Sequence, residues 1–295
     1  MAQFRYREVV CSANFQERKE IRRLFLLTMK TVSINLTVPS SWNDLSDEQL
    51  RYVYSLIAND FSLDEIKTLA LLQWATPKVG VESSVDKGKF LCSVCPLHSP
   101  HSTLHFQLTA LQLAEMLSAL DWLDELPSSP VRLKKIGNHV AVDPDFQGVP
   151  FETFLMVENL YQGFLHTKND ALLDELASLL YKPMHSYLLP HTSPLSKSER
   201  ISIFYWIASL KEMFAKRFSD FFQPAATETE NLLGGSPNIG AQLQEAMDAQ
   251  IRALTKGDIT KEREILSLDT WRALTELNAQ AKEYKQLNAK IYAKK

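Results

Sequence analysis

Four helix-start signals of one kind, between residues 46 and 199, constrain the fold of this chain more than any other feature. In each, a Ser or Thr is followed three residues later by Gln or Glu, and apolar residues follow at helical spacing. The two side chains then satisfy two backbone N–H groups at a helix start, an arrangement called a capping box. We predict a mainly helical chain with helices beginning at Ser46–Gln49, Ser62–Glu65, Thr109–Gln112 and Ser196–Glu199.

Scarce glycine supports the same conclusion. Nine glycines in 295 residues are about 3% of the chain, against an ordinary share of about 7%. Folds that depend on Gly-rich phosphate loops or on many tight β-turns are therefore disfavoured. Most of these glycines fall at expected turns or linkers. Gly163 alone lies inside an expected helix, where we predict close packing against a neighbouring helix.

A few short segments show strand patterns instead. Apolar residues alternate with polar ones over residues 32–38, and residues 81–105 are irregular or β, with a strand over 103–108. Residues 131–142 indicate a hairpin, with Gly137 at the first central position of a type II′ turn. The predicted fold class is therefore mainly α with a small β component (α+β): a mixed N-terminal domain plus a C-terminal helical hairpin.

Composition divides the chain into four parts, of which two are predicted to fold. Residues 1–28 form a basic leader without clear periodicity, and Met29 begins a segment typical of a protein start. Two alternatives stay open: translation begins at Met29, or the chain begins at Met1 with a disordered leader. Residues 29–222 are expected to form a mixed, mostly helical domain with short strands. Residues 223–240, rich in Pro, Gly, Thr and Glu, are expected to be a linker.

Residues 241–295 are expected to form the helical hairpin. One apolar stripe precedes the helix stop at Lys256–Asp258, and a second runs from Trp271 to Ile291 in steps of three and four. Thr260 is expected to cap a short element between the stripes. Two apolar stripes on so small a unit leave one face to bury elsewhere. We therefore expect a protein partner or self-association through 241–295, the alternative being that the hairpin docks on its own N-terminal domain.

Charge and cysteine content indicate which compartment and which kinds of partner to expect. Residues 1–30 carry 7 Lys+Arg against 3 Asp+Glu, residues 31–236 carry 15 against 24, and residues 237–295 carry 10 against 8. The acidic middle disfavours a broad nucleic-acid footprint, which needs clustered Lys and Arg. Three cysteines and the lack of a membrane-spanning apolar run favour a cytoplasmic protein with no membrane partner.

One group of residues has the types that bind zinc. Cysteines and histidines follow one another closely from residue 92 to residue 105, with internal spacings of the kind that structural zinc sites use. The gap between the Cys pair and the last two His is far shorter than usual, which favours a polar loop without metal. No cofactor is therefore expected, and zinc stays as the alternative. The candidate ligands are Cys92, Cys95, His98, His101 and His105.

Motifs of catalysis are absent from the sequence. It contains no G-x-S-x-G, H-E-x-x-H, Walker A or G-x-G-x-x-G pattern. Carboxylates flank the expected helix start at Phe151, with Asp143 and Asp145 before it and Glu152 within it, yet acidic residues near a helix start ordinarily cap it. We therefore assign no catalytic residue and expect no enzyme.

Two segments, residues 38–50 and residues 254–277, carry a resemblance. Residues 38–50 (VPSSWNDLSDEQL), together with residues 254–262 (LTKGDITKE) and 271–277 (WRALTEL), resemble uncharacterised proteins of bacterial prophage and phage-like gene clusters. Such proteins often lie among tail or virion-assembly genes. The resemblance covers about 40 residues, carries no catalytic motif and implies a context, not a mechanism.

The leading expectation is therefore a non-enzymatic interaction protein, an accessory or assembly factor of a phage particle. The first alternative is a zinc-containing or nucleic-acid-associated regulatory module built on residues 92–105 and the basic leader. The second is an enzyme with no recognisable motif, since motifs belong to families and their absence does not exclude activity.

Overall fold

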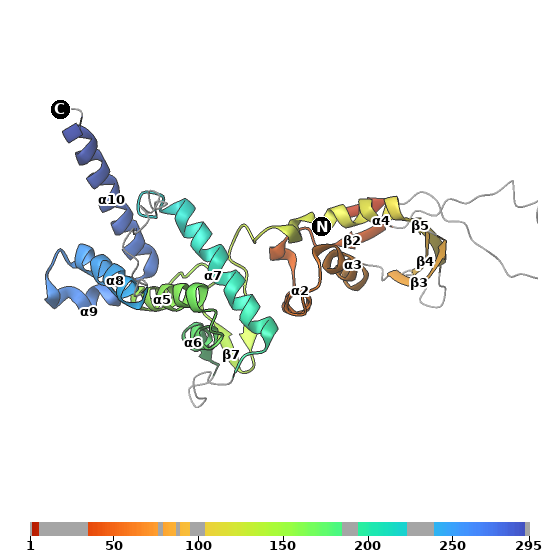
Figure 1. The fold of residues 1–295 in the computed structure, drawn as a ribbon, viewed down its shortest axis with the longest axis horizontal. Helices are drawn as coiled ribbons and strands as arrows, with labels where there is room; N and C mark the ends of the chain where they lie inside the picture. The colour runs from red at the N-terminus through yellow and green to blue at the C-terminus, as the bar shows by residue number, and fades with distance from the viewer. Residues whose placement is uncertain are drawn as a thin grey trace, which may run out of the picture. The chain divides into compact units, whose positions relative to one another are not determined.

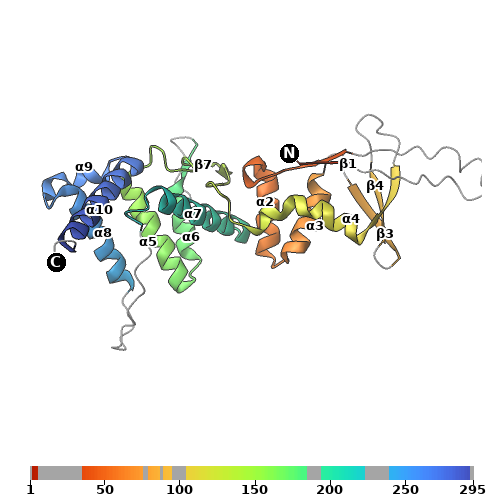
Figure 2. The ribbon, with the colours of Figure 1, turned by 90° about the horizontal axis from the view of Figure 1, so that it is seen from above.

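The computed structural model describes residues 2–5, 35–75, 79–86, 89–94, 104–184, 194–222 and 239–292. These residues are mainly helical with small antiparallel sheets, as predicted (Figures 1 and 2). None of the helices in the described ranges is both long enough and apolar enough to cross a membrane. The chain forms two compact units, unit 1 (Met1–Glu125) and unit 2 (Leu126–Lys295).

Unit 1 combines short helices with two antiparallel sheets. β1 pairs with β2, and β3, β4 and β5 form a three-stranded meander in sequence order. β5 matches the strand predicted over 103–108, and β4 and most of β3 lie in the region predicted to be irregular or β. The elements are β1 Ala2–Arg5, β2 Asn35–Val38, η1 Trp42–Asp44, α2 Asp47–Ala58, α3 Leu63–Trp74, β3 Val79–Asp86, β4 Lys89–Val94, β5 Leu104–Thr109, α4 Ala110–Leu117 and η2 Ser118–Asp124.

Buried aromatic rings form the core of unit 1. Trp42 stacks on Tyr54 with ring centroids 6.1 Å apart and meets Trp122 edge to face at 5.5 Å. Trp122 in turn stacks on Trp74 at 6.4 Å. The indole N–H of Trp42 donates to the backbone oxygens of Trp122 and Glu125, at 3.1 and 3.0 Å. The 3₁₀ helix η2 is therefore held to the start of the unit by both packing and hydrogen bonds.

A buried lysine ties α3 to η2. The Lys67 ammonium lies 2.7 Å from an Asp121 carboxylate oxygen and 2.6 Å from an Asp124 carboxylate oxygen, with only 8% of its side chain exposed. Burial acts to lower the pKa of Lys67, but the hydrogen bonds to Asp121 and Asp124 outweigh it and the pKa is raised. This ammonium therefore stays charged inside the fold, because two carboxylates replace the water it loses.

Unit 2 is helical around one small sheet. β6, β7 and β8 pair antiparallel in that order. Gly137 has φ 53°, while Asn138 is not among the residues with positive φ, as the predicted type II′ turn requires. The elements are β6 Lys135–Ile136, β7 His139–Ala141, α5 Phe151–Thr167, α6 Ala171–Leu180, β8 Tyr181–Pro183, α7 Lys197–Arg217, α8 Ile239–Thr255, η3 Ile259–Lys261, α9 Glu262–Leu266 and α10 Thr270–Tyr292.

All four predicted capping boxes are present, at the starts of α2, α3, α4 and α7. In each, the Ser or Thr side chain accepts the N–H of the residue three positions on, and that residue's side chain accepts the N–H of the cap. Each such cap contributes about 1 kcal/mol to helix stability. The caps are Ser46 with Gln49, Ser62 with Glu65, Thr109 with Gln112 and Ser196 with Glu199.

The long helix α7 forms the centre of unit 2. Trp206 is fully buried, and its ring meets Phe146 and Tyr181 edge to face. Its indole N–H donates to the backbone oxygen of Pro144 at 2.9 Å. Two further turns along, Phe214 is also fully buried. These contacts explain why the sequence of α7 has apolar residues around most of its circumference.

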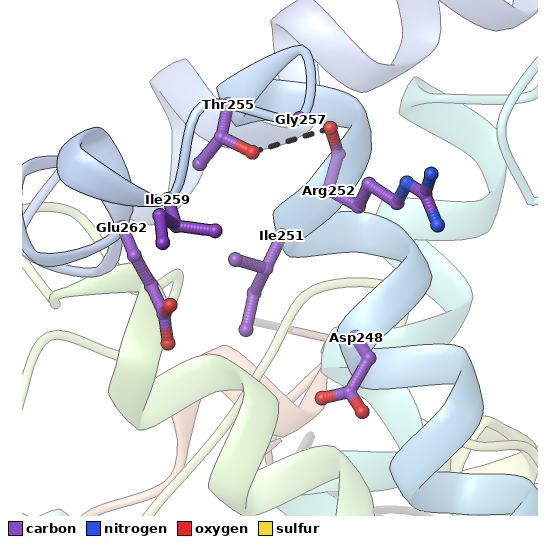
Figure 3. A pocket seen from close by; sticks show the side chains of 7 residues that line it. All are labelled: Asp248, Ile251, Arg252, Thr255, Gly257, Ile259 and Glu262. Carbon is purple, nitrogen blue, oxygen red and sulfur yellow. Dashed lines mark hydrogen bonds between the residues drawn. The ribbon is translucent and has the colours of Figure 1, made fainter.

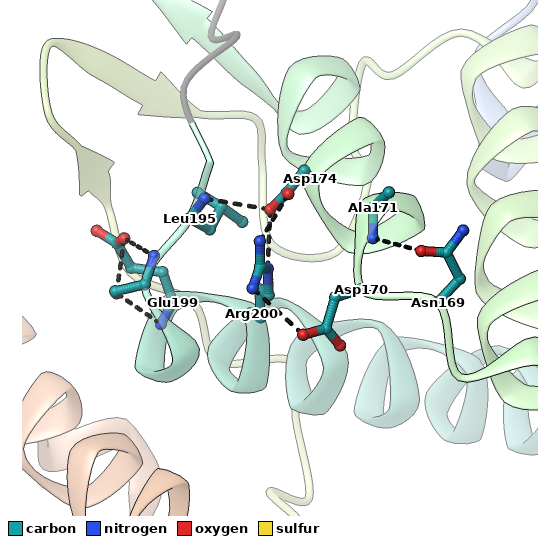
Figure 4. A network of polar contacts seen from close by, with 8 residues as sticks. Asn169, Asp170, Ala171, Asp174, Leu195, Glu199 and Arg200 are labelled. Atoms are coloured by element: carbon teal, nitrogen blue, oxygen red, sulfur yellow. Dashed lines mark hydrogen bonds and ion pairs between the residues drawn. The ribbon is translucent and has the colours of Figure 1, made fainter.

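Arg200, in the first turn of α7, joins this helix to α6 (Figure 4). Its Nε and Nη2 donate to the two carboxylate oxygens of Asp174 at 2.9 and 2.8 Å, and its Nη1 lies 3.2 Å from Asp170. Asp174 also accepts the backbone N–H of Leu195 at 3.1 Å. The fork of the guanidinium thereby fixes the register between the two helices.

Gly163, on α5, has the structural role that the sequence predicted for it. A Cβ added there would lie 3.2 Å from the Cδ1 of Leu172 on α6. The two helices therefore approach closely at this point, and a hydrogen in place of a side chain makes room for the leucine.

The boundary between the two compact units lies at a different place from the domain boundary that the sequence predicted. Residues 126–222 group with 239–292 in unit 2, and the division falls after Glu125. A Pro- and Ser-rich stretch at residues 126–130 (LPSSP) marks this point and was overlooked. Residues 2–5 of the predicted leader belong to the fold as β1. Most of the predicted linker, Met29 and the rest of the leader lie outside the described residues.

Candidate functional site

The C-terminal helix α10 is anchored at its start by buried hydrogen bonds. The N–H and hydroxyl of Thr270 both donate to the backbone oxygen of Val149, at 2.9 and 2.7 Å. The indole N–H of Trp271 donates to the backbone oxygen of Asp145 at 2.7 Å. Because Val149 and Asp145 lie in the segment before α5, the start of α10 is fixed to the body of unit 2.

Apolar packing continues this anchoring for two turns. The Trp271 ring meets Phe214 and Phe218 of the α7 region edge to face, each at 5.6 Å. Leu274 is fully buried and Leu277 is 4% exposed. The predicted stripe of this helix is thus buried against the chain's own α7 and α5 over its first half. This outcome is the docked alternative of the sequence analysis.

Asn278, which is half-buried, adds two further hydrogen bonds to the body of unit 2. Its Oδ1 accepts the backbone N–H groups of Asp220 and Phe221, at 2.9 and 3.0 Å, just beyond the end of α7. Lys285 then adds an ion pair to the Asp220 carboxylate at 2.7 Å. We call residues 270–278 the anchored half of α10 and residues 279–292 its outer half.

The outer half exposes apolar side chains. Tyr284 is 67% exposed, Leu287 57% and Ile291 49%. Their spacing of i, i+3 and i+7 puts them on one face of the helix, in continuation of the predicted stripe. In Figure 1 the outer half extends beyond the other helices of unit 2. Among the residues that the structure describes, nothing covers this face, which lies on a helix whose first half is held by the body of unit 2.

Charged side chains of both signs lie on the outer half. The outer half contains three lysines against one glutamate, which gives a charge of 3 − 1 = +2. Lys282 and Lys290 are exposed, as is Glu283. At about 100° per residue, Glu283 and Lys290 flank the apolar face and Lys282 lies on the opposite side of the helix. The surface that α10 offers is therefore apolar with one acidic and one basic neighbour.

A second exposed apolar residue lies where α8 turns into α9. Ile259, in η3, is 82% exposed, and it separates two shallow hollows of about 410 and 550 Å³. We call the two together the α8–α9 hollow, since both are lined by Ile259 and Glu262. The first is also lined by Asp248, Ile251, Arg252, Thr255 and Gly257, and the second by Glu152, Thr260, Arg263, Leu266 and Ser267.

Figure 3 shows how the first hollow is arranged. The side chains of Ile251 and Ile259 point toward each other between the carboxylates of Asp248 and Glu262. The guanidinium of Arg252 extends away from them. This hollow therefore presents an apolar floor with carboxylates on two sides.

The turn that presents Ile259 is set by the backbone. α8 ends at Thr255, and Lys256 and Gly257 follow with φ 53° and 80°, so the predicted helix stop is confirmed. The prediction that Thr260 caps the next element is wrong: the Asp258 side chain accepts the N–H of Thr260. The hydroxyl and N–H of Thr260 also lower the pKa of Asp258. Asp258 is the better cap because its carboxylate can accept both donors at once.

Of the five predicted zinc ligands, only Cys92 and His105 lie among the described residues. Cys92 lies in β4, in register with Phe106, and His105 lies in β5, in register with Ser93. Cys95, His98 and His101 fall outside the described residues, so the zinc alternative stays a prediction. Among the described residues, no group of three or more His, Cys, Asp or Glu is placed to hold a metal ion.

The carboxylates before α5 serve the local turn. Asp143 Oδ1 accepts the backbone N–H groups of Asp145 and Gln147, at 3.0 and 3.1 Å. Burial, together with the nearby charge of Asp143, raises the pKa of Asp145. These contacts stabilise the turn over residues 143–147. The helix α5 itself begins after Pro150 without a side-chain cap, so the capping role that the sequence analysis expected of these carboxylates is not found.

The α8–α9 hollow was missed by sequence reasoning. Ile259 follows a helix stop and belongs to no apolar stripe, so hydrophobic periodicity gave no sign of its exposure. Its position next to Gly257 and Asp258, in a segment of turn-forming residues that usually lies at the surface, was the available signal. Comparison of the chain with protein-family models, curated proteins and solved structures finds no match.

Proposed function

We propose that this chain is a non-enzymatic interaction protein and that the outer half of α10 is its binding element. The observation that carries the proposal is the exposure of Tyr284, Leu287 and Ile291 on a helix whose first half is buried. Helices that bind in grooves of a partner use anchors at i, i+3 and i+7, the spacing found here. Because α10 is already folded and anchored at its start, binding does not cost the conformational entropy of ordering the helix.

The resemblance to proteins of prophage and phage-like gene clusters supports a narrower version of this proposal. In that version the protein is an accessory or assembly factor of a phage particle. The identity of the neighbouring genes tests it. Tail or capsid genes on both sides would support the assembly role, and metabolic genes on both sides would contradict it while leaving the binding element untouched.

Site-specific photo-crosslinking in the native cells tests the binding element. A photoreactive phenylalanine analogue replaces Leu287, and the matched control places it at Leu111, an apolar residue of α4 that is 71% exposed. We expect a discrete covalent protein adduct from position 287 and none from position 111. The absence of any adduct at 287, in protein that folds normally, would contradict the proposal.

The alternative of a zinc-containing or nucleic-acid-associated module depends on Cys92, Cys95, His98, His101 and His105 and on the basic leader. Metal analysis of protein purified without a histidine tag tests the zinc, and salt-dependent retention of DNA or RNA tests the nucleic acid. A folded, metal-free protein without such retention leaves the interaction role as the better supported one.

A further inference from the structure

We infer that α8 is a detachable helix: its first half, residues 239–250, opens away from α5 while the rest of unit 2 stays folded. The inference concerns a different element from the outer half of α10, so it does not rest on the proposed function. Three features of α8 carry it: partial burial of its first half, a weak side-chain contact with α5, and a buried acceptor atom that no protein group satisfies.

The first half of α8 is only partly buried. Every side chain from residue 241 to residue 250 is half-buried or exposed, including the apolar Leu243 and Met247. Buried side chains occur in the last turn of this helix, where Leu254 is 9% exposed and Thr255 is 5% exposed. Because hydrophobic stabilisation grows with the apolar area removed from water, the body of unit 2 holds the end of α8 more strongly than its first half.

The polar contact between this half and the body is weak. The Nδ2 of Asn159, on α5, donates to the thioether sulfur of Met247 at 3.6 Å, and thioether sulfur is a poor acceptor. In the described part of the chain, the other side-chain hydrogen bonds of α8 stay within the helix. Thr270 and Trp271 of α10, by contrast, donate to backbone oxygens of the body at 2.7 Å each.

A buried polar atom weakens the packing of α8 further. Gln250 lies on the same side of the helix as Leu243, Met247 and Leu254, from which it is seven, three and four positions away. Its Oε1 is buried, and none of the described residues donates a hydrogen bond to it. A buried acceptor without a donor costs free energy only while α8 is closed, since opening returns the atom to water. Gln250 therefore favours the open state.

Opening of this half is a local unfolding. An isolated helix of this length is marginal in water, so residues 239–250 lose their helical hydrogen bonds when they leave α5. Leu254 and Thr255 remain buried and act as the hinge. Because Asp248 lines the first hollow, opening removes one wall of that hollow and uncovers the face of α5 that carries Asn159. Elements that move in function are drawn from such regions of low local stability.

Amide hydrogen exchange of the full-length protein, followed by mass spectrometry, measures this opening. We expect the amides of residues 243–250 to exchange at least about a hundredfold faster than those of residues 203–210 in the buried helix α7. Their rate should also stay constant in low concentrations of urea, because a local opening exposes little new surface. The amides of residues 203–210 should exchange faster as urea is added.

Two variants test the role of the buried acceptor. Gln250→Leu removes the acceptor and keeps an apolar side chain in its place, so it should slow the exchange of residues 243–250 about tenfold. Gln242→Leu makes the same change at an exposed position of the same helix and is the matched control, with no expected effect on these amides. Circular dichroism and thermal unfolding check that both variants are folded.

Two results would overturn the inference. Residues 243–250 could exchange as slowly as residues 203–210 and with the same dependence on urea, which would mean that α8 opens only when the whole unit unfolds. Gln250→Leu and Gln242→Leu could have equal effects on exchange, which would mean that the buried acceptor does not favour the open state. Either result would leave the proposed role of the outer half of α10 unchanged, since photo-crosslinking at position 287 tests that role separately.

Discussion

The two halves of α10 have the same apolar periodicity and opposite surroundings. In the anchored half, Leu274 is fully buried, and Trp271 contacts two phenylalanines of the α7 region. In the outer half, Tyr284 is 67% exposed. A stripe of apolar residues therefore predicts that a helix has a face to bury, but not what buries it. Tertiary contacts supplied by α7 and the segment before α5 make the difference.

The largest effect is expected from the aromatic residue of the anchored half. Trp271→Ala removes the ring contacts with Phe214 and Phe218 and the hydrogen bond to Asp145, so it should lower the free energy of unfolding by about 3–5 kcal/mol. Tyr284→Ala, an aromatic truncation on the same helix, is the matched control and should cost less than about 0.5 kcal/mol. Denaturant titration measures both. Similar losses from the two would refute the division of α10 into halves.

A smaller effect is expected at the boundary between the halves. Asn278→Ala leaves the N–H groups of Asp220 and Phe221 without their side-chain acceptor, which should lower the free energy of unfolding by about 1–3 kcal/mol. Asn288→Ala, in the outer half, is the matched control and should change it by less than about 0.5 kcal/mol. Amide hydrogen exchange at Asp220 and Phe221 should also speed up in the first variant only. Unchanged exchange there would contradict the anchoring role of Asn278.

A still smaller effect is expected from the ion pair beyond the boundary. Lys285→Met breaks the contact with Asp220, which is partly exposed, and should cost less than about 1 kcal/mol. The loss should shrink further in high salt, because salt screens exposed pairs. Lys282→Met, on the same half, is the matched control with no expected loss. Because Met keeps the aliphatic stem and removes only the charged end, a cost that stays constant with salt would contradict the ionic role of Lys285.

The smallest effect on stability is expected from the binding face itself. A triple variant, with Tyr284, Leu287 and Ile291 changed to Gln, replaces exposed groups with a good helix former and should change the free energy of unfolding by less than about 1 kcal/mol. Binding of a partner should nevertheless be lost. Calorimetric unfolding measures the stability, and co-purification of the partner found by photo-crosslinking measures the binding. A large loss of stability would show that this face is buried in the protein's own fold.

Much of the helical fold could be predicted, because its signals are local. Capping boxes involve residues only three positions apart, and all four were found with both hydrogen bonds. The type II′ turn at Gly137 and the helix stop at Gly257 are local in the same way. Both depend on a glycine with positive φ, a backbone conformation that glycine adopts more readily than other residues.

The remaining features depend on contacts between distant residues. The packing of α10 with α5 and α7 depends on contacts such as the hydrogen bond between Thr270 and Val149. Hydrophobic periodicity describes one helix at a time and therefore cannot predict a contact between residues so far apart in the sequence. The exposure of Ile259 likewise follows from where the turn after α8 points. The assignment of a binding element to residues 241–295 stays a prediction, and the exposure of Tyr284, Leu287 and Ile291 restricts the proposal to the outer half of α10.

The capping boxes also have a consequence for behaviour in acid. The boxes of α2 and α4 close with the neutral amides of Gln49 and Gln112, whereas those of α3 and α7 close with the carboxylates of Glu65 and Glu199. Hydrogen bonds from the backbone and side chain of Ser62 lower the pKa of Glu65. The stability from this box is present above the ordinary glutamate pKa and is lost as pH falls through the lowered one. The helices α2 and α3 of unit 1 thus begin with similar capping geometry but respond differently to acid. As the pH falls, the capping box of α3 loses part of the stability it contributes, whereas the capping box of α2 keeps its contribution.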